Sequence, residues 1–138
     1  MSLNNADLDN PQEVLDSINN QMKEYYRNMD YYDQDLDGLV KLGSRVATLF
    51  WFIASEEAKA TAKLDLLKAQ LHTNFKEGED KLTIPDIESK IKQATHEDNV
   101  YAKSLTNALR AMDRILTQVA IRIKNLRKER LDSDNPIR

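Results

Sequence analysis

The clearest hydrophobic pattern runs from residue 97 to residue 131, where apolar and basic positions separate at helical spacing. Apolar residues follow one another by three or four positions along one face of this predicted helix: Tyr101, Leu105, Ala108, Met112, Ile115, Val119, Ile123 and Leu126. At about 100° per residue, five bases gather near the opposite face: Lys103, Arg110, Arg114, Lys124 and Lys128. The apolar face requires a packing partner, and the basic face is the first candidate for binding.

A first helix is predicted to begin at Pro11. Asn10 suits the N-cap, Pro11 has a preset φ for the first helical position, and Glu13 suits the third. A narrow apolar seam of coiled-coil type then follows: Leu15, Ile18, Met22, Tyr25, Met29, Tyr32 and Leu36.

A second long helix is predicted from Leu39 to about Phe75. One apolar stripe follows it: Leu39, Leu42, Val46, Leu49, Ile53, Ala60, Leu64, Leu67 and Leu71. The other face carries small residues and a Trp where a solvated face would carry Lys and Glu: Ser44, Ala47, Trp51, Ser55, Ala58, Ala62 and Ala69. We therefore predict that the second helix is sandwiched, either by the first helix or by another subunit. The predicted oligomer interface comprises Ala47, Trp51, Ser55, Ala58 and Ala62.

Turn and cap residues divide the second half of the chain. Gly78 lies in a predicted turn, and Thr83 suits the N-cap of a short linker helix that continues to about Ala94. Thr95 or His96 is expected to cap the last helix.

The composition favours an all-α fold, because the chain has only three Gly and three Pro and is rich in good helix formers. We predict a single domain over residues 1–138, with residues 1–10 and 132–138 flexible. Its architecture is a long antiparallel helical hairpin with an additional N-terminal helix and a short linker helix, and it oligomerises.

Charge is divided between the two parts of the chain. Residues 1–60 carry 11 acids and 5 bases, a net charge of −6, whereas residues 61–138 carry 12 acids and 15 bases, a net charge of +3. A basic half can attract a polyanion when its charges share one surface, even though the whole chain has a formal charge of −3.

Sequence motifs for catalysis are absent. The chain has no Cys, no glycine-rich phosphate loop, and two separated histidines, His72 and His96, without neighbours at metal-ligand spacing. We therefore predict a non-enzymatic protein with no cofactor and no metal site.

Residues 33–38 resemble the start of a calcium-binding loop, with Asp33, Asp35, Asp37 and Gly38 at the expected positions. However, the position for the bidentate carboxylate is Ser44. The segment therefore favours a turn or an N-cap for the next helix over a calcium site.

The chain also lacks the hydrophobic segments of a membrane protein. No apolar run approaches the roughly 20 residues that span a bilayer, and the acidic start does not match a signal peptide. We expect a cytoplasmic protein without a membrane partner, located in the host cytoplasm if it is encoded by a phage.

Spaced bases on the two long helices are candidates for phosphate contacts. The predicted nucleic-acid-binding residues are Lys59, Lys63, Lys68, Lys103, Arg110, Arg114, Lys124 and Lys128, with Arg122, Arg127 and Arg130 adding charge nearby. The alternative is an ordinary solvated face, in which bases near a helix C-terminus interact with the helix dipole. Tyr25, Tyr26, Tyr31 and Tyr32 could stack on bases, although the seam positions of Tyr25 and Tyr32 favour core packing.

The segment Glu56-Glu57-Ala58-Lys59-Ala60-Thr61-Ala62-Lys63-Leu64-Asp65 is rich in alanine and charge. Together with the short helix after Pro85 and the basic last helix, it resembles the UvsY family of bacteriophage recombination mediators over residues 39–130. That family consists of small all-helical proteins that form rings, bind single-stranded DNA and help load a RecA-like recombinase onto strands covered by a single-strand-binding protein.

The resemblance implies single-stranded DNA, a RecA-like recombinase, a single-strand-binding protein and copies of the same chain as partners. Lys63-Leu64-Asp65 matches the end of a DNA-binding segment of that family, whereas Thr61 stands where the family has a base. We therefore expect a recombination mediator that assists recombinase loading. The alternative is a helical structural or adaptor protein that acts through oligomerisation and protein contacts without binding nucleic acid.

Overall fold

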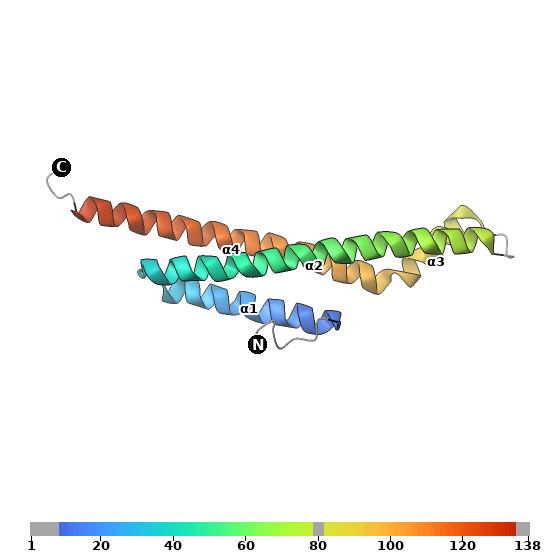
Figure 1. Cartoon of the computed structure of the whole chain (residues 1–138), viewed down its shortest axis with the longest axis horizontal. Coiled ribbons are helices and arrows are strands. Elements are labelled where there is room, and N and C mark those ends of the chain that lie inside the picture. The colour runs from blue at the N-terminus through green and yellow to red at the C-terminus, as the bar shows by residue number, and fades with distance from the viewer. Residues whose placement is uncertain (1–8, 79–81, 135–138) are drawn as a thin grey trace. The chain divides into compact units, whose positions relative to one another are not determined.

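The computed structural model describes residues 9–78 and 82–134. These residues form four α-helices and no strand: α1 (Pro11–Tyr31), α2 (Leu36–Glu77), α3 (Ile84–Ala94) and α4 (His96–Asp134) (Figure 1). The prediction of an all-α fold is confirmed for this part of the chain. The predicted flexible residues 1–8 and 135–138 lie outside it.

The described residues divide into two compact units. Unit 1 comprises residues 9–53 and 107–134, and unit 2 comprises residues 54–78 and 82–106. The division falls inside α2 and again inside α4, so each long helix contributes one segment to each unit. The antiparallel hairpin, the single domain and the oligomer concern the whole chain, and they stay predictions.

Helix α1 begins as predicted, because the Asn10 side chain accepts the backbone N–H groups of Gln12 at 3.1 Å and Glu13 at 3.3 Å. The apolar seam extends to Leu36, but α1 ends at Tyr31, before the predicted turn. Helix α2 begins at Leu36, three residues before its predicted start at Leu39.

The acidic turn between α1 and α2 explains why α1 ends before the apolar seam does. Asp35 Oδ1 accepts the backbone N–H of Gly38 at 3.0 Å, so Asp35 caps α2. The Tyr32 ring lies so close to Gly38 that a Cβ atom at that position would collide with it. The segment is thus a turn and an N-cap, which confirms the prediction that was favoured over calcium binding. No group of three or more metal-binding side chains occurs in the described ranges.

The predicted linker helix is confirmed as α3. The Thr83 hydroxyl accepts the Asp86 N–H at 3.3 Å and caps its start. Thr95 closes α3, and its hydroxyl donates to the Ile91 carbonyl at 2.8 Å, so this side chain is not directed to the first turn of α4. Helix α4 extends to Asp134, beyond the predicted fraying at residue 132.

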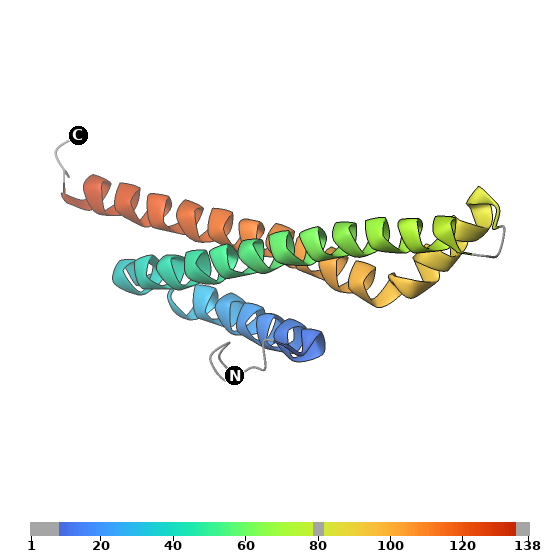
Figure 2. The ribbon, with the colours of Figure 1, turned by 45° about the vertical axis from the view of Figure 1, so that its right-hand side comes forward.

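Unit 1 contains most of the buried apolar side chains of the described residues. Figures 1 and 2 show the course of the helices that contribute them. These side chains come from all three helical segments of the unit: Val14, Ile18, Tyr25 and Met29 of α1, Leu39, Leu42, Val46, Leu49 and Ile53 of α2, and Ala108, Met112, Ile115, Val119 and Leu126 of α4. Gly43 of α2 faces Val119 of α4, because a Cβ atom at position 43 would lie in ordinary contact with Val119 Cγ1, at 3.4 Å. The predicted stripes of α2 and α4 therefore form the core of this unit.

Unit 2 has a thinner core, with only Leu64, Ile87, Ile91, Ala102 and Leu105 as buried apolar side chains among its described residues. A polar layer replaces apolar contact where Glu56 and Glu57 interrupt the stripe of α2. Glu57 Oε1 accepts the hydroxyl of Thr106 from α4 at 3.3 Å, and Glu56 pairs with Lys59 at 3.5 Å.

Arg122 joins α4 to the end of α1 in unit 1. One guanidinium nitrogen donates to the Met29 carbonyl at 2.7 Å and to Asp33 at 3.3 Å, and the other donates to Asp30 at 3.3 Å. Met29 lies in the last turn of α1, where carbonyl groups lack helical partners. The Arg122 side chain is only 29% exposed, so it holds the α1 end against α4 while its charge is balanced by two carboxylates.

We predict that Arg122→Ala lowers the free energy of unfolding by about 1–3 kcal/mol, mainly through loss of the bond to the Met29 carbonyl. The two exposed carboxylates contribute less because water screens them. Arg122→Lys should recover only part of the loss, since an ammonium lacks the planar fork. Urea unfolding measures the change, and Lys124→Ala is the control. Equal stability of Arg122→Ala and Lys124→Ala would contradict this role.

Burial raises the pKa of Tyr25 above its ordinary value of 10.0. The Arg45 guanidinium, 5.7 Å from the centroid of the Tyr25 ring, lowers this pKa, and the negative charge of Glu24 raises it. A raised pKa in the folded state means that the unfolded chain releases the Tyr25 proton first as the pH rises. The stabilising contribution is therefore complete below pH 10 and is lost as the pH rises through the folded-state pKa.

We predict that Tyr25→Phe makes the stability less sensitive to pH above about 10, the ordinary tyrosine pKa. Urea unfolding at neutral and alkaline pH measures this sensitivity. Tyr26→Phe is the matched control, because Tyr26 is exposed on the same helix. An unchanged alkaline slope in Tyr25→Phe would show that Tyr25 ionisation does not limit stability.

Candidate nucleic-acid interface

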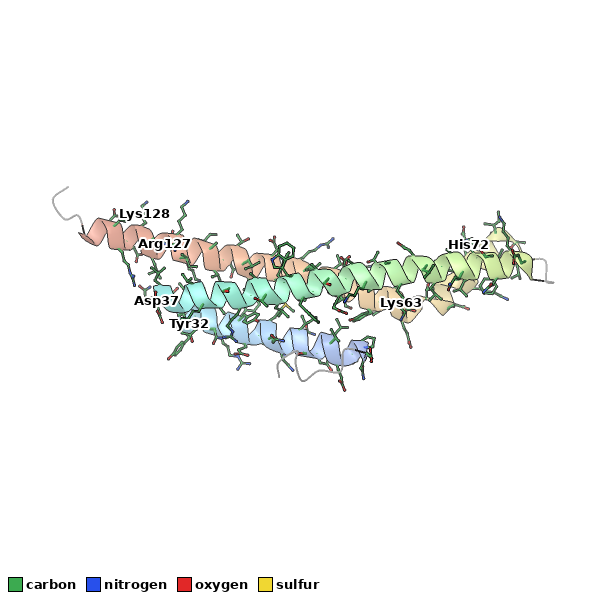
Figure 3. All side chains as sticks on the ribbon, viewed as in Figure 1. Tyr32, Asp37, Lys63, His72, Arg127 and Lys128 are labelled. Carbon is green, nitrogen blue, oxygen red and sulfur yellow. The ribbon has the colours of Figure 1, made fainter. Side chains whose placement is uncertain are left out.

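The basic face of α4 within unit 1 comprises Arg110, Arg114, Lys124 and Lys128, and all four side chains are exposed. Within the described residues, none of them forms an ion pair with a carboxylate. They lie on the side of α4 opposite Met112, Ile115 and Val119, whose burial fixes the rotation of the helix. Four cations are thus exposed along one helix, and Figure 3 labels one of them, Lys128, towards the end of α4.

The other four predicted contacts belong to unit 2. Lys59 pairs with Glu56 at 3.5 Å, and Lys63 lies 4.0 Å from Asp98. Lys68 is half-buried, and Lys103 is exposed without a carboxylate partner among the described residues. The eight predicted residues therefore divide equally between the two units, and the α4 face of unit 1 is the part whose members share one surface.

The three additional arginines have different surroundings. Arg122 lies about 120° around the helix from Arg110, and its contacts with Met29, Asp30 and Asp33 use it in packing. Arg127 and Arg130 are exposed. The sequence run of bases therefore overstates the charge that is free to bind.

The four tyrosines also separate into core and surface residues. Tyr25 is buried and Tyr32 is half-buried, which confirms the core packing that their seam positions favoured. Tyr26 and Tyr31 are exposed, and Tyr31 meets the Tyr32 ring edge-on with centroids 5.0 Å apart. The structure thus provides exposed rings at Tyr26 and Tyr31 rather than a platform of four.

The small-residue face of α2 is open to solvent in the described chain. Trp51 is 71% exposed, and Ser55, Ala58 and Ala62 are exposed while Ala47 is half-buried. In unit 1, α1 packs on another face of α2 and leaves Trp51 uncovered. The prediction that α1 covers the small-residue face of α2 is therefore wrong, and coverage by another subunit stays a prediction.

Unit 2 contains a surface pocket that was not predicted. Its volume is about 220 Å³, and its lining comes from three helices: Lys68 and His72 of α2, Glu88, Ile91, Lys92 and Thr95 at the end of α3, and Asn99 of α4. No local pattern in the sequence indicates this pocket, because Lys68 and His72 meet α3 only through tertiary packing. Figure 3 locates His72 on α2.

One tyrosine in unit 2 has a perturbed pKa. Burial raises the pKa of Tyr101, and the negative charge of Glu56 raises it further. Tyr101 thus stays protonated at neutral pH and acts as a neutral packing residue.

Among the described residues, no helix has both the length and the apolar composition required to cross a bilayer. Comparison of the chain with protein-family models, with curated proteins and with solved structures found no match in any of the three.

Proposed function

We propose that the protein is a non-enzymatic helical module that binds single-stranded DNA through the α4 face of Arg110, Arg114, Lys124 and Lys128. The observation that carries this proposal is the exposure, along one face of one helix segment, of four cations that pair with no carboxylate of the described residues. From Arg110 to Arg130 the sequence has seven bases and two acids, so this segment is positive although the whole chain has a formal charge of −3.

Phosphate contact accounts for affinity without sequence specificity. Arg110 and Lys128 are 18 positions apart, so their Cα atoms lie about 27 Å apart along the α4 axis. A strand along this face can therefore contact several cations in turn, and each contact releases condensed counterions. The exposed Tyr26 and Tyr31 rings are on α1, so the α4 face supports backbone binding rather than base stacking.

The resemblance to the UvsY family supplies the biological role in this proposal. The protein would hold single-stranded DNA while a RecA-like recombinase replaces a single-strand-binding protein on the same strand. Four phosphate contacts per chain give modest affinity, and several copies in one oligomer would multiply it through effective concentration. This activity requires positioning and charge rather than a catalytic residue or a cofactor.

We predict that binding of a labelled single-stranded oligonucleotide weakens with salt, with a slope of about −2.8 in log K against log salt for four contacts. Arg110→Ala with Arg114→Ala should reduce the slope to about −1.4 and weaken binding about tenfold at low salt. Fluorescence anisotropy measures both quantities.

The matched control for this experiment is Lys23→Ala with Arg27→Ala on α1, which removes the same charge from exposed positions. This control should retain the original slope. Absence of binding at low salt, or equal losses in the two double variants, would contradict a DNA site on α4.

The exposed Trp51 favours a second function, that of a structural or adaptor protein that assembles without nucleic acid. Trp51 meets the Phe50 ring edge-on with centroids 5.8 Å apart, and both rings lie in unit 1. A large exposed ring beside small residues is suited to close packing against another helix. In this case the oligomer would tolerate charge reversal at Lys63 and Arg114.

We predict that Trp51→Glu shifts the chain towards the monomer, because a carboxylate would be buried at the subunit contact. Sedimentation velocity over a range of concentrations measures the assembly. Trp51 is the only Trp in the chain, so its emission should shift to shorter wavelength as the protein concentration rises.

Tyr31→Glu is the control for this assembly experiment, since Tyr31 is an aromatic residue of unit 1 that is 81% exposed. Its assembly should match that of the unchanged protein. A chain that is monomeric at all concentrations would exclude both the adaptor function and the multivalent form of DNA binding.

A further inference from the structure

The pocket of unit 2 combines cationic groups that the proposed DNA face does not use. Lys68 and His72 are one turn apart on α2, and Lys92 faces the same pocket from α3. None of the three makes a hydrogen bond or an ion pair with another side chain among the described residues. Two ammonium groups and an imidazole therefore surround one small concave space.

The remaining lining residues define the shape and polarity of the pocket. Ile91 and Thr95 are buried, and the Thr95 hydroxyl already donates to the Ile91 carbonyl at 2.8 Å, so it has no proton left for a ligand. Asn99 contributes a side-chain amide from the first turn of α4, and its backbone N–H already donates to the Thr95 carbonyl at 2.9 Å. A volume of about 220 Å³ is below the range for drug-sized ligands, so the space suits a small anion.

Among the described residues, Glu88 is the one carboxylate in the lining, and it selects among anions. It lies one turn before Lys92 on α3, yet no ion pair joins these two residues. An ionised carboxylate only accepts hydrogen bonds, so an anion beside it must donate one. Hydrogen phosphate retains a proton at neutral pH and can donate, whereas sulfate has none to donate.

We propose that this pocket binds a hydrogen phosphate ion. Lys68, Lys92 and Asn99 donate to the phosphate oxygens, His72 contributes an N–H group, and the phosphate hydroxyl donates to Glu88. This site is separate from the proposed DNA contact, because the α4 face belongs to unit 1 and none of its four residues lines the pocket.

The proposal is tested by NMR. The full chain, labelled with ¹⁵N, is titrated with sodium phosphate at pH 7, and the amide chemical shifts are recorded at each step. Sodium chloride holds the ionic strength constant. We expect saturable shifts that are concentrated at the lining residues, and weaker binding of sodium sulfate under the same conditions. Equal shifts with chloride or sulfate in place of phosphate would overturn the proposal.

Variants separate the pocket from general surface charge. Lys68→Ala and Lys92→Ala should each weaken phosphate binding about tenfold, as expected for loss of a charge-assisted hydrogen bond. Lys90→Ala is the matched control, because Lys90 lies 5.8 Å from the Phe75 ring centroid and is not in the lining. Equal weakening in all three variants would overturn the proposal, and the dispersion of the amide spectrum verifies folding.

The role of Glu88 has its own measurement. Glu88→Gln should bring the affinities for phosphate and sulfate to within about twofold, because a side-chain amide can donate to either anion. An undiminished preference for phosphate would exclude Glu88 as the selecting group. If the unchanged protein binds DNA but not phosphate, only the pocket proposal is refuted. If it binds phosphate but not DNA, only the α4 interface is refuted.

Discussion

Burial of a single stripe of α2 is the constraint on which unit 1 depends. The α2 stripe from Leu39 to Ile53 is buried, and α1 and α4 bury their own apolar faces in the same unit. Contacts join all three pairs of segments: Gly43 of α2 faces Val119 of α4, Arg45 of α2 lies over Tyr25 of α1, and Arg122 of α4 binds the end of α1. Rotation of any one segment would expose apolar area and break a polar contact at once.

This packing determines which surfaces remain for function. A helix that buries one face must present its other face to solvent or to a partner. On α4 that remaining face is cationic, and on α2 it carries Trp51 and small residues, so the two long helices present different chemistry from the same unit. Charge complementarity suits the first to a polyanion, and the uncharged second face suits close approach of a helix.

Local patterns in the sequence predicted the helices well. Asn10 and Thr83 act as caps through atoms two or three residues away, and the buried stripes follow from spacings of three or four residues. The turn at residues 33–38 was predicted from its acids and Gly38, but α2 begins at Leu36, three residues before its predicted start, because Asp35 caps it. Spacing alone does not fix the residue at which a helix begins after a short turn.

The candidate sites required information that local patterns do not contain. Arg122 resembles its neighbours on α4, but its partners lie 89 to 93 positions earlier in the chain. The pocket of unit 2 is likewise lined by residues of α2, α3 and α4. In the sequence, Glu88 and Lys92 therefore look like any other charged residues of a short helix.

The net charge of the chain is therefore a poor guide to what it binds. In unit 1, the carboxylates of Asp30 and Asp33 are directed to Arg122, which faces the end of α1, and not to the bases of the exposed α4 face. Screening limits the interaction between exposed charges to about 10 Å at moderate salt, so a ligand responds to the face that it touches rather than to the sum over the chain. An acidic α1 and a cationic α4 can thus coexist in one unit, and the negative total does not argue against a polyanion site on α4.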